Sequence, residues 1–202
     1  MLTVMASTGQ LPVKPSDSPE REPIALSRLA AFGLLYALLA LPVLLLKTVP
    51  LGIIAASLLL AVGLALLSTI DVQSYRLPDL LTLPLLAAGL ACAAFGGVEA
   101  FGWHAASAAI GGVLLYAVNQ LYLIVRGENG LGLGDAKLFA AAGAWTGAQG
   151  LSSILLIACV AALSAVVVWR LRNHALDRHT AIPFGPFLAL GTWAVWLYGP
   201  LL

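Results

Sequence analysis

Seven long apolar stretches dominate the sequence and limit the folds that are open to it. An α-helix needs roughly 20 apolar residues to cross a hydrocarbon core about 30 Å thick. Hydrophobic residues make up 61% of the chain and charged residues only 9%, whereas about 25% of a soluble domain is charged. The sequence therefore predicts an all-α polytopic integral membrane protein with about seven transmembrane helices, in a range of six to eight. The predicted helices cover Leu29–Leu46, Leu51–Ile70, Leu80–Val98, His104–Val125, Asp135–Ala148, Leu151–Trp169 and Ile182–Leu201.

The fifth predicted helix is short, so it either spans with local bilayer thinning or enters the membrane only part-way behind other helices. Residues 1–28 differ from everything that follows, because they combine several prolines with serines, threonines and mixed charge. Such a segment buries too little apolar surface to order itself. We predict a disordered cytoplasmic tail over 1–28 and one membrane-embedded domain over 29–202.

Basic residues predict the orientation, because loops on the cytoplasmic side of a membrane carry an excess of Lys and Arg. With the amino terminus in the cytoplasm and seven spans, only Lys47 lies outside. The inside segments then hold nine basic residues: Lys14, Arg21, Arg28, Arg76, Arg126, Lys137, Arg170, Arg172 and Arg178. The overall net charge of +1 gives no sign of a nucleic-acid partner.

Acidic residues stand at the ends of two apolar stretches. Asp71 closes the second stretch and Asp79 follows it closely, while Asp135 opens the fifth stretch directly after Gly134. An ionisable side chain inside a membrane is costly, and its default interpretation is a functional site. The predicted orientation puts Asp71 and Asp135 at the same, cytoplasmic face. We therefore expect these two carboxyl groups to converge.

Two converging carboxyl groups indicate aspartic peptidase chemistry. They cannot easily both ionise, so they share one proton, and one then acts as general base on water while the other acts as acid. The helix dipoles favour Asp135, at an amino end, as the ionised partner and Asp71, at a carboxyl end, as the protonated one. The alternative is structural: Asp71 and Asp79 are solvated loop residues, or Asp79 and Asp135 are helix N-caps.

Metal chemistry finds little support in the sequence. Cys92 and Cys159 lie in apolar stretches, where thiols act as small buried hydrophobes, and no CxxC pair is present. His174 and His179 stand in a basic loop with no carboxylate to complete a site. No metal and no cofactor are expected. The polar pair Asn119-Gln120 in the fourth apolar stretch either hydrogen-bonds across helices or lines a cavity.

Three blocks in this chain carry a family resemblance. They read Asp71…Leu77-Pro78-Asp79-Leu80-Leu81-Thr82-Leu83-Pro84, then Gly132-Leu133-Gly134-Asp135-Ala136-Lys137-Leu138, then Ile182-Pro183-Phe184-Gly185-Pro186-Phe187. In this order the blocks resemble the type IV prepilin leader peptidases, the membrane aspartic peptidases that mature pilins and type II secretion pseudopilins. The resemblance implies Asp71 and Asp135 as the catalytic pair. It implies supporting positions at Pro78, Asp79, Gly132, Gly134, Lys137, Pro183 and Gly185.

The resemblance also implies a place and a partner. The expected location is the bacterial cytoplasmic (inner) membrane with a cytoplasmic active site, and the expected partner is a prepilin or pseudopilin. Larger members carry a methyltransferase domain with a tetracysteine zinc site, which we expect this chain to lack. A presenilin-like membrane protease, a small transporter that uses Asp71 and Asp135 as a proton relay, and an inactive assembly protein are the alternatives. The oligomeric state is left open.

Overall fold

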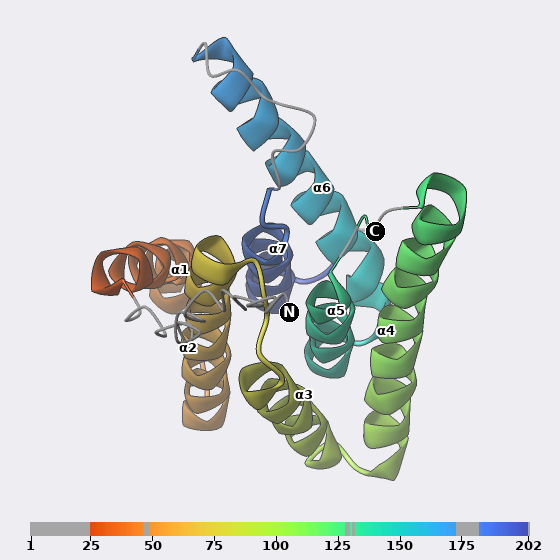
Figure 1. Ribbon diagram of the computed structural model, residues 1–202. Coiled ribbons are helices and arrows are strands. Elements are labelled where there is room, and N and C mark those ends of the chain that lie inside the picture. Colours follow the sequence, from red (N-terminus) through yellow and green to blue (C-terminus); the bar gives the residue numbers. More distant parts are fainter. Residues whose placement is uncertain (1–24, 47–48, 128–129, 131, 173–181, 202) are drawn as a thin grey trace, which may run out of the picture.

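The computed structural model describes residues 25–46, 49–127, 130, 132–172 and 182–201, and the regular elements within them are all α-helices. Residues 1–24 of the tail predicted over 1–28 lie outside the described residues, as do His174 and His179. Seven helices follow the predicted order (Figure 1), with ends shifted by a few residues. Their bounds are α1 Leu26–Leu46, α2 Leu51–Ser74, α3 Asp79–Ala94, α4 Val98–Arg126, α5 Leu133–Thr146, α6 Ala148–Leu171 and α7 Gly185–Tyr198.

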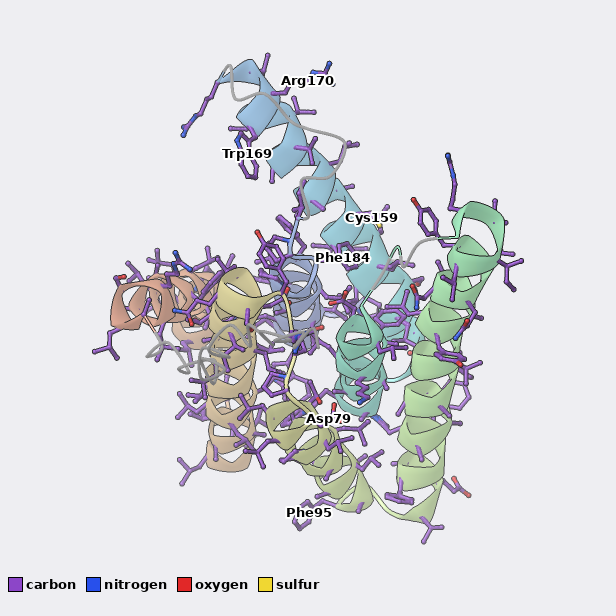
Figure 2. All side chains as sticks on the ribbon, viewed as in Figure 1. Asp79, Phe95, Cys159, Trp169, Arg170 and Phe184 are labelled. Atoms are coloured by element: carbon purple, nitrogen blue, oxygen red, sulfur yellow. The ribbon has the colours of Figure 1, made fainter. Side chains whose placement is uncertain are left out.

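Four of the described helices, α1, α2, α4 and α6, are long and apolar enough to cross a membrane. Their outward faces carry many exposed large apolar side chains, such as Leu58, Val113 and Leu163, and Figure 2 shows side chains projecting outward along each of them. Helices α5 and α7 have 14 residues each, which at 1.5 Å per residue is only about 21 Å. The predicted count of about seven spans is therefore not established by helix length.

The short helix α5 lies at the centre of the bundle, in contact with α3, α4, α6 and α7 (Figure 1). Most residues of α5 are apolar and buried, including the fully buried Leu138 and Phe139, as expected for a helix enclosed by others. A Cβ added at Gly143 would lie 2.6 Å from the Ser107 carbonyl oxygen, and one at Gly111 would lie 2.9 Å from the Phe139 carbonyl oxygen. Glycines thus let the backbones of α4 and α5 touch, as small residues do between membrane helices.

Helix α7 joins the two sides of the bundle, because it contacts α1 and α2 on one side and α5 and α6 on the other. The Trp193 Nε1–H donates to the Tyr36 carbonyl oxygen at 3.0 Å, and the Trp196 Nε1–H donates to Ser57 Oγ at 2.8 Å. Trp193 is only 3% exposed. Its indole therefore fixes α7 against α1 from within the core.

The two cysteines differ in exposure. Cys92 is half-buried on α3, whereas Cys159 is exposed on α6 (Figure 2), so the expectation of two buried thiols is wrong for Cys159. Both are free thiols.

Candidate active site

Four helix ends meet at one place in the bundle: the carboxyl end of α2 and the amino ends of α3, α5 and α7. A cavity of about 650 Å³ opens there. Its lining includes all three of the acidic residues noted in the sequence. The described lining residues are Asp71, Tyr75, Arg76, Leu77, Asp79, Asn119, Gln120, Gly132, Leu133, Gly134, Asp135 and Lys137. The predicted convergence of Asp71 and Asp135 is thus seen in the geometry of this cavity.

Asp71 lies in the last turn of α2 rather than after its end, because α2 continues to Ser74. Its side chain is only 5% exposed. The backbone N–H of Gly185, the first residue of α7, donates to Asp71 Oδ2 at 3.0 Å. A Cβ added at Gly185 would lie 2.7 Å from that same oxygen. Glycine at this position therefore allows the amino end of α7 to reach the carboxyl group.

Asp135 is the third residue of α5 and is only 7% exposed. The structure puts Gly132, not Asp135, at the N-cap position, and the Gly132 backbone N–H donates to the Asp135 carboxyl group. This bond is the side-chain arm of a capping box, in which the third helical residue accepts from the N-cap N–H. Asp71 and Asp135 line the same cavity, so the two carboxyl groups lie near each other.

Gly134 explains how the two halves of the site come together. A Cβ added there would lie 2.7 Å from Leu77 Cβ and 3.3 Å from the Leu77 backbone nitrogen. The loop between α2 and α3 therefore crosses directly over the first turn of α5. Any side chain at Gly134 would hold the loop off α5 and separate Asp71 from Asp135.

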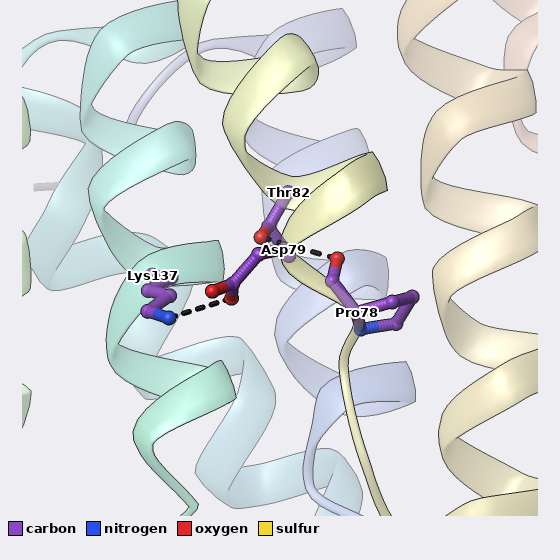
Figure 3. A network of polar contacts seen from close by, with 4 residues as sticks. All are labelled: Pro78, Asp79, Thr82 and Lys137. Carbon is purple, nitrogen blue, oxygen red and sulfur yellow. Dashed lines mark hydrogen bonds and ion pairs between the residues drawn. The ribbon is translucent and has the colours of Figure 1, made fainter.

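Asp79 has a different role from the one expected of an N-cap. The N-cap of α3 is Pro78, and no side chain caps this helix end. Asp79 instead forms an ion pair with Lys137 of α5, with Oδ1 and Nζ 2.5 Å apart (Figure 3). Both side chains are well exposed, Lys137 by 42% and Asp79 by 57%. The pair links α3 to α5 at the rim of the cavity.

The remaining predicted site residues take peripheral positions. Pro78 begins α3 and its carbonyl oxygen accepts from Thr82 Oγ1 at 3.3 Å (Figure 3). Pro183 is half-buried just before α7 and is not among the cavity residues. Neither proline is among the described residues that line the cavity, and both stand at the start of a helix whose amino end lies near it.

Sequence reasoning missed several residues of the cavity wall. Tyr75, Arg76 and Leu133 line it together with the noted pair Asn119-Gln120 of α4, of which Asn119 is buried. The signal for Tyr75 and Leu133 was their spacing, since each stands within four residues of an aspartate. No group of three or more His, Cys, Asp or Glu side chains with metal-binding geometry occurs among the described residues.

The site geometry weakens the basis for predicting that Asp71 carries the shared proton. The prediction that Asp71 is protonated and Asp135 is ionised took account only of the helix on which each aspartate lies. Asp71, at the carboxyl end of α2, also receives the Gly185 N–H at the amino end of α7. Asp71 therefore meets a carboxyl helix end and an amino helix end, whereas Asp135 meets an amino end on its own helix, so the dipole contrast between them is smaller than predicted.

Comparison with known proteins connects this site to a family. The sequence profile of the type IV leader peptidase family matches residues 58–167, more than half of the chain. No solved structure matches. Among curated proteins, the chain is 43% identical over 145 residues to a prepilin leader peptidase/N-methyltransferase of Pseudomonas aeruginosa, covering 71% of this chain and 49% of that protein.

Two further relatives carry the same name. One, from Aeromonas salmonicida, is 40% identical over 167 residues, covering 82% of this chain and 56% of that protein. The other, from Burkholderia pseudomallei, is 40% identical over 152 residues, covering 74% of this chain and 48% of that protein. The chain thus spans about half the length of the curated relatives it matches.

Proposed function

This chain belongs to the type IV leader peptidase family, and from that premise we propose that it is an intramembrane aspartic endopeptidase. Its substrate class is the type IV prepilins or type II secretion pseudopilins, whose short basic leader it removes. The observation that carries the proposal is the cavity whose lining includes both Asp71 and Asp135, which come from two separate helices. Family membership favours this reading over a presenilin-like protease, a proton-coupled transporter or an inactive assembly protein.

The reaction uses one shared proton. Both carboxyl groups are buried and near each other, so only one ionises readily. The ionised carboxylate takes a proton from a water molecule, whose oxygen attacks the scissile carbonyl carbon. The protonated carboxyl group hydrogen-bonds the carbonyl oxygen, stabilising the tetrahedral intermediate, and a proton then passes to the leaving amine as the C–N bond breaks. The acid and base groups end the cycle with one proton between them.

The backbone supports these two groups. The Gly185 N–H holds the Asp71 carboxyl group, and the Gly132 N–H holds that of Asp135. Catalytic groups need this kind of fixed orientation, since a small misplacement lowers the rate strongly. No resident metal or cofactor takes part in the proposed reaction.

We infer the membrane placement from the helix directions. Helix α2 ends at the cavity, whereas α3, α5 and α7 begin there, as expected if seven helices alternate in direction across the membrane. The basic residues Arg76 and Lys137 lie at this end, which is the cytoplasmic side by the excess of basic residues. The proposed location is the bacterial inner membrane, with the active site and the amino terminus in the cytoplasm and lipid around the apolar exterior.

The test is cleavage of a purified prepilin by the purified protein in detergent. We expect a shortened product from the wild type and none from Asp71→Asn. Asp79→Asn is the matched control, because it makes the same change at a more exposed carboxylate of the same cavity. An intact prepilin with a folded wild type would refute the proposal. Cleavage of unrelated membrane peptides would then favour a presenilin-like protease. Proton flux into vesicles that contain the protein would favour a transporter.

A further inference from the structure

Helices α2 and α4 end in the same way but with different residues. Each stops at a residue in the left-handed region, Tyr75 (φ 52°, ψ 31°) for α2 and Gly127 (φ 73°, ψ 6°) for α4. In both cases the backbone N–H of this residue donates to the carbonyl oxygen four residues earlier, Asp71 at 2.9 Å and Leu123 at 2.8 Å. Glycine adopts this conformation without steric cost and a bulky residue does not. Among the described residues, Tyr75 is the only non-glycine with positive φ.

Tyr75, which adopts this unfavourable conformation, lies beside the two aspartates. It stands one helical turn after Asp71 and lines the cavity that holds both aspartates. Its side chain is 56% exposed, and among the described residues it is the only aromatic one in that lining. Gly127 is not part of the cavity wall. The unfavourable residue is thus found at the helix end beside the reacting groups, and the favourable residue at the helix end away from them.

We propose that Tyr75 is a substrate-contacting residue, whose ring packs against the peptide segment next to the scissile bond. A residue held in a sparsely populated backbone conformation at a functional site is a mark of such a role. An aromatic ring offers a large apolar surface with little conformational freedom to lose. The Tyr75 ring therefore suits contact with an uncharged peptide segment better than the charged side chains of the cavity do. This inference rests on the proposed peptidase function.

A structural role for Tyr75 makes a different prediction. Tyrosines gather at membrane interfaces, where the ring anchors a helix end. An anchor would support insertion and stability of the protein and would not affect substrate affinity. Substrate contact would affect the apparent KM, and stability would be unchanged or improved without the ring, because the left-handed strain would be relieved.

The experiment compares Tyr75→Gly, Tyr75→Phe and Gly127→Tyr with the wild type. Thermal stability is measured in a fixed detergent, and kcat and apparent KM are measured on a purified prepilin in the same micelles. For Tyr75→Gly we expect an unchanged or higher Tm and a kcat/KM that falls about tenfold, mainly through KM, the size expected of one aromatic contact. Tyr75→Phe keeps the ring and should restore the affinity. Gly127→Tyr should lower Tm with KM unchanged, since it adds the strain away from the cavity.

Two results would overturn the inference. In the first, the wild type cleaves the prepilin and Tyr75→Gly does so with an unchanged KM. In the second, Tyr75→Gly loses Tm or membrane insertion with KM unchanged, which would make Tyr75 an anchor. A folded wild type that leaves the prepilin intact would instead refute the proposed function, and the role of Tyr75 in substrate binding would fall with it.

Discussion

Replacement of Gly185 by alanine tests whether the contact between α7 and Asp71 matters for catalysis. The added Cβ would lie 3.0 Å from Asp71 Cγ and only 2.7 Å from Asp71 Oδ2, and the second distance is shorter than real Cβ atoms show. The carboxyl group must therefore turn away or α7 must shift. Either movement lengthens the 3.0 Å bond from the Gly185 N–H to the carboxyl oxygen.

The size of the effect follows from the bond that is lost. A hydrogen bond to a charged group contributes about 1.5–3 kcal/mol, and about 1.4 kcal/mol corresponds to a factor of ten in rate. We therefore expect Gly185→Ala to lower kcat/KM for prepilin cleavage by roughly 10- to 150-fold. The free energy of unfolding should change little. Alanine is favoured over glycine in a helix by about 1 kcal/mol, and this gain offsets the cost of the close contact with Asp71.

Two other glycines provide matched controls for the same substitution. Nothing lies within 4 Å of a Cβ added at Gly102 of α4, so Gly102→Ala should leave Tm and cleavage unchanged. A Cβ at Gly191 of α7 would lie 2.6 Å from the Ile154 carbonyl oxygen. Gly191→Ala therefore forces α7 off α6, and overpacking of this kind costs about 1–3 kcal/mol. It should lower Tm by several degrees.

The assay is the rate of prepilin cleavage together with thermal unfolding in the same detergent. We expect Gly185→Ala to lose activity and keep its Tm, whereas a variant that is only destabilised, such as Gly191→Ala, loses Tm. A Gly185→Ala variant with wild-type kcat/KM would show that this bond does not position a reacting group. A variant that loses Tm as Gly191→Ala does would show that Gly185 serves packing instead.

Three further outcomes are expected. Asp71→Asn and Asp135→Asn should each lower prepilin cleavage at least about a hundredfold with normal membrane insertion, because an amide cannot move the shared proton; substantial activity in either folded variant would exclude a two-aspartate mechanism. Asp79→Asn should cost less than about fivefold, since an exposed ion pair contributes about 1 kcal/mol or less, and the exchange of Asp79→Lys with Lys137→Asp should recover most of any loss; equal loss at all three aspartates would show that the pair is wrongly assigned. Cleavage should continue after dialysis against a chelator, and a loss restored by added metal ions would reveal a ligand set not recognised in the sequence.

The sequence by itself determined the helices and the identity of the acidic groups. Apolar stretch length and the polar breaks between stretches are local properties, so the seven helices were predicted in the right order. The two aspartates stood out because a charge beside an apolar stretch is costly wherever the chain folds. The predictions from local sequence were least accurate at helix ends. Helix α2 runs beyond Asp71 to Ser74, and Pro78, not Asp79, is the N-cap of α3.

Only the tertiary structure decided which helix ends meet. It put Gly185 of α7 against Asp71 and Leu77 against Gly134, and it enclosed the short helix α5 among four others. It also gave Asp71 the amino end of a second helix, which reduces the asymmetry expected from the dipole of α2 alone. These contacts join residues far apart in the chain, and they depend on whether two surfaces fit once all side chains are in place. No local pattern of hydrophobicity or spacing carries that information, because the fit is a property of both partners together.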